Sequence, residues 1–268
     1  MHKVYESLED YAADIQKCIV GKNYESAYPS NEEWSGDALP VALGILANGG
    51  FDKHEARVNA IIDELRVDGL FSSGVPLPSR SYAGSRPNIT AYLAGHPKQM
   101  FRRVHDEHTS INTPISIYIE TTVSAGVSDY QIVNRGIALT AFVLAMQSIR
   151  PVEMYAVSSV LTHQDNLVTM CTKVCSGTID TGRVMYALTS NAYARRVGLA
   201  MLNQFIGVHP RTSHQVPTTK ENCEKVRAEL GLSHEDIYIP GGHLYDSKML
   251  NEPVAWVREK VEEHNHLE

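Results

Sequence analysis

Along the second half of the chain, apolar residues recur in some segments at the two-residue period of a strand and in others at the period of a helix. Residues 115–122 alternate between apolar and polar side chains, as a strand does, and an apolar helical stretch follows Ser128. Further strands are expected at 152–160, 167–175 and 236–239, and further helices within 181–206, at about 220–230 and at 252–263. Strands that alternate with helices predict an α/β sheet layered with helices.

The first part of the chain is predicted to be mainly helical. Apolar residues recur at helical spacing over 3–17, 37–47 and 53–66. Residues 68–88 are rich in proline and glycine and form the longest expected irregular loop. We therefore expect a helical N-terminal region at 1–111 and an α/β domain at 112–268, with one continuous domain as the alternative.

The composition argues against several classes of protein. The chain has 268 residues, of which 43% are hydrophobic, and a formal net charge of -7, which argues against wholesale binding of nucleic acid or of anionic membranes. No apolar run approaches the ~20 residues that span a bilayer, and the acidic, amphipathic N-terminus does not read as a secretory signal. These observations predict a cytoplasmic globular protein.

The cysteines agree with a reducing compartment. Cys18, Cys171, Cys175 and Cys223 contain no CxxC pair, and buried free thiols are the simplest interpretation. Cys171 and Cys175 lie four residues apart in one expected strand, so they should point to the same face, too far apart for a disulfide.

The stretch ISIYIETTVSAGVSDYQIVNRG, residues 115–136, runs from a strand through a hydroxyl-rich turn into a helix. Ser128 and Gln131 have the spacing of a capping box, so the helix should open near Ser128. Ligands of α/β sheets bind beyond the carboxyl ends of strands, where helix N-termini present free N–H groups. The candidate partner- or anion-binding residues are Thr122, Ser124, Ser128 and Arg135.

The order of strand, hydroxyl-rich turn, long helix, two strands and helix resembles a von Willebrand factor A-like domain. In that family an Asp-x-Ser-x-Ser signature ends the first strand and holds a divalent cation, and a later loop adds a hydroxyl ligand. The matching positions here are Glu120, Thr122 and Ser124, and SGTIDTG offers Thr178 or Thr181. The resemblance implies a Rossmann-like layered sheet with helices on both faces. It also implies a Mg²⁺ or Mn²⁺ site at Glu120, Thr122, Ser124 and Thr178.

The signature departs from the family at the position that matters most for a cation. A glutamate replaces the aspartate, a threonine replaces a serine, and no residue matches the last acidic position except Asp236 or Asp246. In the alternative interpretation, the hydroxyls satisfy backbone groups of the turn, and Glu120 is exposed or pairs with Arg135. The sequence favours this alternative, so we expect no cofactor.

Three longer segments resemble a family of uncharacterised proteins of phages and bacteria. The segments are AYLAGHPKQM, VSAGVSDYQIVNRGIALTAFVLAM and SGTIDTGRVMYALTSNAYARRVGLAML, and they span about residues 90–205. The resemblance implies a phage or mobile-element source, and hence a host cytoplasm. It implies no reaction.

The arginines allow two interpretations. Arg102–Arg103 and Arg195–Arg196 could form basic patches for nucleic acid, although internal pairing is favoured for Arg195–Arg196 at the start of a helical segment. Arg135 could reach an anion at the turn, but an exposed surface arginine is the commoner case. Gly136 is expected to pack closely against a strand.

The histidines offer weaker signals for catalysis. His105 and His108 are three residues apart but have no partner ligands at a known metal-site spacing. His243 follows a strand in a glycine-rich loop, close in sequence to Asp246. The chain contains no GxSxG, no GxxxxGK[ST] and no GxGxxG after a strand.

Together these patterns favour a non-enzymatic protein-interaction or assembly module that is phage-encoded. Its face would comprise the turn at 122–128 and the loop at 71–88, and its partner would be another protein, not a membrane. One alternative is a metal- or phosphate-dependent hydrolase that uses Glu120, His243 and Asp246 at the same sheet edge. The other alternative is nucleic-acid binding through the local arginine patches.

Overall fold

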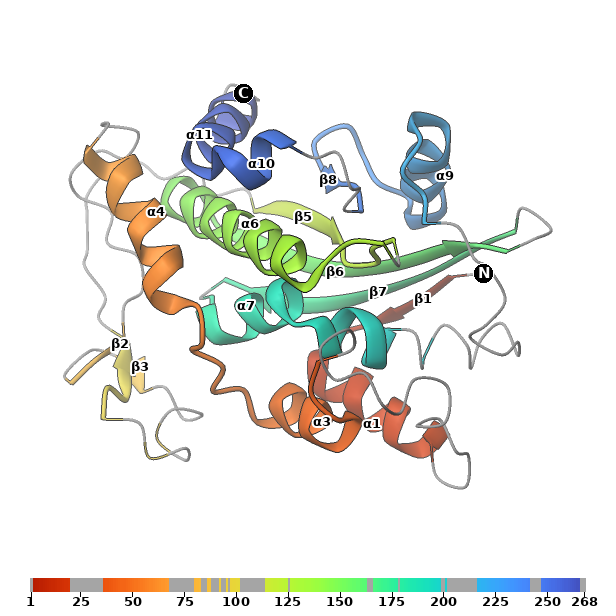
Figure 1. The fold of residues 1–268 in the computed structure, drawn as a ribbon, viewed down its shortest axis with the longest axis horizontal. Helices are drawn as coiled ribbons and strands as arrows, with labels where there is room; N and C mark the ends of the chain where they lie inside the picture. The colour runs from red at the N-terminus through yellow and green to blue at the C-terminus, as the bar shows by residue number, and fades with distance from the viewer. Residues whose placement is uncertain are drawn as a thin grey trace.

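A five-stranded mixed sheet lies at the centre of the molecule, with strand order β1-β7-β6-β5-β8 (Figure 1). The strands are β1 (His2–Tyr5), β5 (Ile115–Glu120), β6 (Val152–Leu161), β7 (Leu167–Ser176) and β8 (Ile237–Ile239). All neighbours are parallel except β6 and β7, which form an antiparallel hairpin. The carboxyl ends of β6, β5 and β8 therefore meet at one edge of the sheet.

This computed structural model describes a defined part of the chain. The described residues are 2–19, 36–67, 80–82, 86–87, 92, 95, 97–101, 114–124, 126–162, 166–177, 179–198, 201, 216–241 and 247–265.

Most described helices pack on one face of the sheet, around one continuous hydrophobic core. They are α1 (Leu8–Ile19), α3 (Leu39–Asn48), α4 (Glu55–Val67), α6 (Asp129–Ile149), α7 (Thr181–Thr189), η2 (Tyr193–Gly198), α10 (Ser247–Asn251) and α11 (Pro253–Asn265). Helix α9 (Lys220–Leu230) lies on the opposite face, where Val226 packs against Val157 and Cys171. The predicted α/β class is confirmed, with helices on both faces of the sheet.

Helix α6 is the central helix of this layer, and it is buried on nearly every side. Ser128 and Gln131 form the capping box that their spacing predicts. Of the described helices, α6 is long and apolar enough to cross a membrane, but most of it is buried as in a core helix. Gly136 packs against α7, not against a strand as expected, because an added Cβ would overlap the Leu188 carbonyl.

The N-terminal residues form strand β1, where the apolar spacing had predicted a helix. The prediction of a helix from residue 3 was wrong, since residues 2–5 pair in parallel with β7 and the helix begins at Leu8. Alternation explains the strand, because Tyr5 is buried while Val4 is 46% exposed. Lys3 and Tyr5 both contact Asp14 of α1, at 2.5 and 2.7 Å.

A β-bulge in β7 separates the two cysteines that were expected on one face. Met154 pairs with Cys175 and Tyr155 pairs with Lys173, so Val174 is an extra residue in the ladder. Cys175 therefore points into the main core while Cys171 faces α9. Both are buried free thiols as predicted, Cys223 is a partly buried free thiol, and the side chain of Cys18 lies outside the description.

Two strands of a second, three-stranded sheet lie in the stretch 68–88 that was expected to be irregular, and the third lies beyond it. Its strands are β2 (Arg80–Ser81), β3 (Arg86–Pro87) and β4 (Met100–Phe101), paired antiparallel in the order β2-β4-β3. The remainder of 68–88, including 71–79, lies outside the described residues.

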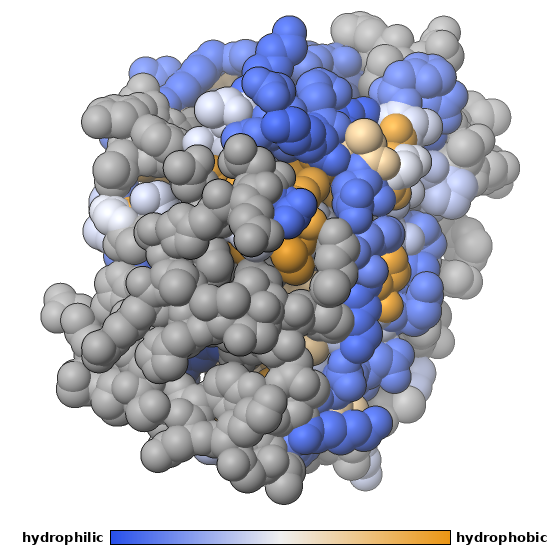
Figure 2. Space-filling view, turned by 90° about the vertical axis from the view of Figure 1, so that its right-hand side faces the viewer, coloured by the Kyte–Doolittle hydropathy of each residue, from blue (hydrophilic) through white to orange (hydrophobic). Residues whose placement is uncertain are grey.

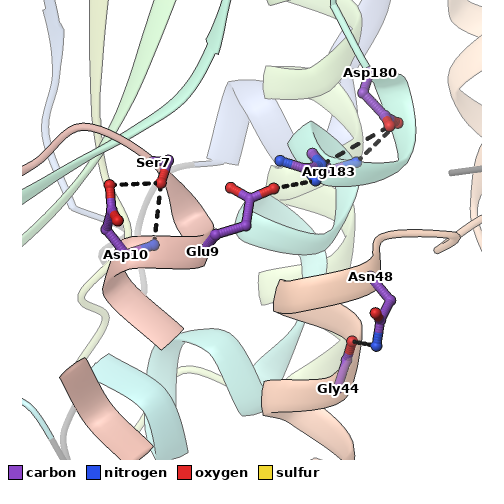
Figure 3. A network of polar contacts seen from close by, with 7 residues as sticks. All are labelled: Ser7, Glu9, Asp10, Gly44, Asn48, Asp180 and Arg183. Atoms are coloured by element: carbon purple, nitrogen blue, oxygen red, sulfur yellow. Dashed lines mark hydrogen bonds and ion pairs between the residues drawn. The ribbon is translucent and has the colours of Figure 1, made fainter. Parts of the chain in front are cut away.

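Polar contacts join α1 to α7 on the sheet's helical side (Figure 3). Glu9 of α1 forms an ion pair with Arg183 of α7. Asp180 caps α7 by accepting from the backbone N–H groups of Gly182 and Arg183, at 3.0 and 3.4 Å. Ser7 caps α1 in the same way, accepting from the N–H of Asp10 at 3.0 Å. These caps explain where both helices begin.

Candidate functional site

The candidate site is the turn that leaves the carboxyl end of β5. We call residues 121–128 the edge turn; residue 125 lies outside the described residues. The turn connects β5 to α6, and it lies where the carboxyl ends of β6, β5 and β8 meet. This is the place where open α/β sheets bind their ligands.

Glu120, the last residue of β5, is fully buried below the edge turn. Its Oε1 accepts from the backbone N–H of Ser159 at 2.9 Å and from that of Thr122 at 3.1 Å. Its Oε2 is buried and has no hydrogen-bond partner among the described residues. The alternative interpretation had Glu120 either exposed or paired with Arg135, and the full burial of Glu120 excludes the exposed position.

The burial of Glu120 changes its acidity. Burial raises the pKa of Glu120 from its ordinary value of 4.5 to about 7, against the opposing effect of the hydrogen bonds from Ser159 and Thr122. The neutral form is therefore favoured in the folded protein over an unusually wide range of pH.

The hydroxyl groups at the start of the edge turn hold it against β6. Thr122 Oγ1 accepts from the Ser159 N–H at 3.1 Å, the same N–H that binds Glu120. Thr121 Oγ1 donates to the carbonyl of Val157 at 2.9 Å and lies 3.0 Å from Ser158 Oγ. Both hydroxyls thus bind backbone or side chains of the neighbouring strand.

The end of the edge turn is also held, and it leads to an exposed aromatic residue. The Ser128 N–H donates to Gln131 Oε1 at 2.9 Å, and the Gln131 N–H donates to Ser128 Oγ at 3.3 Å. Tyr130, between these two residues, is 71% exposed. Ser124 in the middle of the turn is partly exposed.

A π-helix, η2, clamps the edge turn from the side of α7. Arg195 is buried and donates to the carbonyl of Val127. Asn191, just before η2, donates to the carboxylate of Asp129 in the first turn of α6. Burial lowers the pKa of Arg195 to about 10. Arg195 was predicted to pair within the protein, and the Asp129 carboxylate does favour its charged form electrostatically, in addition to the hydrogen bond to Val127. No sequence signal predicted the π-helix.

The residues that follow β8 pack against the edge turn and α6 on a third side of the turn. Arg135 is 5% exposed and donates to the carbonyl of Pro240 at 2.6 Å, so the expectation of a surface arginine was wrong. Gly241 packs so tightly that an added Cβ would lie 2.7 Å from the Thr122 carbonyl and 3.1 Å from Glu120 Cγ. Arg135 is buried because the chain that follows β8 packs against α6 at Pro240.

The residues proposed for a cation do not fit one well. Glu120 is the sole carboxylate among them, its burial favours the neutral form, and Thr122 Oγ1 already binds a backbone N–H. Thr178 lies outside the described residues. Its neighbour Gly177 donates to the carbonyl of Val152 at the amino end of β6, and Thr181 opens α7, so the SGTIDTG loop leaves β7 at the opposite edge. Among the described residues, no three His, Cys, Asp or Glu side chains gather.

The other residues noted in the sequence are placed as follows. Arg196 donates to the Gly36 carbonyl at 3.4 Å. Asp236 accepts from the Ser233 N–H at 2.7 Å and precedes β8, at the edge opposite the turn. The remaining candidates lie outside the described residues; they are Arg102, Arg103, His105, His108, His243 and Asp246.

Comparison with known proteins identifies the family of the chain but not its function. No curated protein and no solved structure has significant similarity to the chain. A family model described as a domain of unknown function, DUF7192, matches residues 1–266. The chain therefore belongs to the DUF7192 family.

Proposed function

We propose that this protein is a non-enzymatic protein-interaction or assembly module that binds a partner protein through the edge turn and the first turn of α6. The observation on which this rests is the exposure of Tyr130, at 71%, in the first turn of α6, directly after a turn that is held from three sides. Tyrosine is one of the residues that most often anchor protein interfaces.

The fixed geometry of the turn supports binding without rearrangement. Glu120 and Thr122 hold the start of the turn to β6, η2 holds Val127, and Arg135 joins α6 to the chain after β8. A surface that is ordered before binding loses little conformational entropy when the partner docks. Figure 2 views the side of the molecule toward which β5 points, and it shows hydrophobic atoms at the surface between hydrophilic ones.

We propose that the fold is related to von Willebrand factor A-like domains. The observed order of β5, turn, α6, β6, β7 and α7 supports that relation. We propose a module that has lost the cation, since the family's aspartate is replaced by the fully buried Glu120 and Thr122 Oγ1 already binds a backbone N–H. We further propose that the protein is phage-encoded and acts in the host cytoplasm.

Affinity capture with matched variants tests the proposal. Tyr130→Ala removes the exposed ring and Ser124→Trp blocks the turn, so both should abolish capture of a partner while leaving the melting temperature unchanged. Tyr92→Ala is the control, because Tyr92 is 64% exposed but belongs to another part of the chain. Equal capture by all three variants would overturn the proposal.

A second candidate function is a hydrolase at the same edge. The observation that favours it is the buried Glu120, whose pKa of about 7 suits a group that both donates and accepts protons near neutral pH. Hydrolysis of simple aryl phosphates or esters that is lost in Glu120→Gln and kept in Tyr130→Ala would support this candidate. Among the described residues, Arg195 and Arg196 of the nucleic-acid alternative donate to backbone carbonyls, and its other pair, Arg102 and Arg103, lies outside the described part of the chain.

A further inference from the structure

The junction between α7 and η2 contacts two parts of the chain that are far apart in sequence. On one side it contacts the end of the edge turn through Arg195 and the first turn of α6 through Asn191. On the other side it contacts Gly36, whose carbonyl accepts from Arg196 at 3.4 Å. Because π-helices are rare and costly, a six-residue one that makes both contacts calls for an explanation.

The contact with Gly36 leaves no room for a side chain. An added Cβ would lie 2.7 Å from the backbone nitrogen of Ala192 and 3.1 Å from Asn191 Cβ. The first of these atoms belongs to the backbone, so it can yield only if the junction itself moves. Gly36 also has a φ of 68°, a conformation that favours glycine.

The same junction also binds the end of the edge turn and the start of α6. Asn191, which borders Gly36, holds the carboxylate of Asp129 in the first turn of α6. Arg195 and Arg196 are adjacent in η2, and they donate to Val127 on one side and to Gly36 on the other. A displacement at Gly36 must therefore move the groups that hold the end of the edge turn.

We propose that the α7–η2 junction is a relay that couples the position of Gly36 to the order of the edge turn, and so regulates the partner-binding face. The regulatory part rests on the proposed function, since it names what the edge turn binds. The coupling itself is a property of the chain alone. A partner or a chain movement that shifts Gly36 would loosen the edge turn without touching it.

Hydrogen exchange of the isolated protein tests the coupling. In Gly36→Ala the new methyl group displaces Asn191 and Ala192, and amide exchange over 127–132 should accelerate about tenfold or more. Gly50→Ala is the matched control, because Gly50 has a φ of 88° but open space within 4 Å. It carries similar backbone strain without the contact, so exchange over 127–132 should stay unchanged.

Two results would overturn the relay. One is equal acceleration over 127–132 in Gly36→Ala and Gly50→Ala. The other is acceleration in Gly36→Ala that is uniform over the sheet and the helices, which would show global destabilisation. Acceleration confined to the edge turn, the start of α6 and η2 is the result expected.

A double-mutant cycle separates the relay from a direct effect. Arg195→Met combined with Asn191→Ala removes both connections, the guanidinium that binds Val127 and the amide that binds Asp129. If the relay runs through these two residues, Gly36→Ala should add little to the exchange rate over 127–132 in this background. Additive effects would overturn it. Because no partner enters these measurements, their failure is distinguishable from failure of the proposed function in the capture experiment.

Discussion

The Glu120 carboxyl on β5 accepts a hydrogen bond from the backbone N–H of Ser159 on β6, across 2.9 Å. This contact joins the edge turn to the neighbouring strand through a buried acid. The burial of this acid, opposed by the hydrogen bond, raises its pKa and makes stability depend on pH in the direction opposite to that expected for Asp14 and Glu153, whose pKa values are lowered.

We expect the contribution of Glu120 to stability to fall as pH rises. Its pKa is raised from 4.5 to about 7 in the folded protein, so folding binds its proton more tightly. The contribution is complete below pH 4.5 and is lost as pH rises through 7. The full change is about 3 kcal/mol at most.

Urea unfolding of the wild type and of Glu120→Gln over this pH range measures the effect. Glutamine keeps the shape and the oxygen that accepts from Ser159 and Thr122, but it cannot ionise. The stability of the wild type relative to Glu120→Gln should therefore fall with rising pH. A difference that stays constant across the range would contradict the assigned environment of Glu120.

Two helical glycines should respond to alanine in opposite directions. Gly136→Ala places a methyl group against the Leu188 carbonyl, so we expect a loss of about 1–3 kcal/mol in unfolding free energy. Gly44→Ala, in the interior of α3 with open space within 4 Å, should gain up to about 1 kcal/mol. Thermal or urea unfolding measures both. Similar shifts of the same sign would contradict the close packing of α6 on α7.

The cap of α7 should be worth a measurable part of the stability. Asp180 accepts from the N–H groups of Gly182 and Arg183 (Figure 3), so Asp180→Ala should cost about 1 kcal/mol. Asp180→Asn keeps an accepting oxygen and should cost a few tenths of that. Equal losses in the two variants would indicate that charge, and not the cap, is the cause.

Divalent cations should leave the folded protein unaffected. Glu120 favours its neutral form and Thr122 Oγ1 binds a backbone N–H, so we expect no change in melting temperature with millimolar Mg²⁺ or Mn²⁺. Thermal melts of the wild type and Glu120→Ala check this. An increase in the wild type that is absent from Glu120→Ala would place a cation at the edge turn after all.

Local sequence patterns predicted much of the fold because strand alternation and helix caps depend on residues that are close together in the sequence. The alternation at β5 and the capping box at Ser128 each depend on neighbouring residues. β1 was missed because its four residues form a strand only when β7 lies beside them. The bulge at Val174 is likewise a property of the paired strands, and it reversed the direction of Cys175.

The sequence by itself determined the α/β class, the order of its main elements and the position of the edge turn. It identified the residues of that turn but not their surroundings. The burial of Glu120 and Arg135, the clamp by Arg195 and the contact of Gly36 with Ala192 were decided by the tertiary structure. The physical reason is that pKa, hydrogen-bond partners and available space depend on groups that are distant along the chain and adjacent only in the fold.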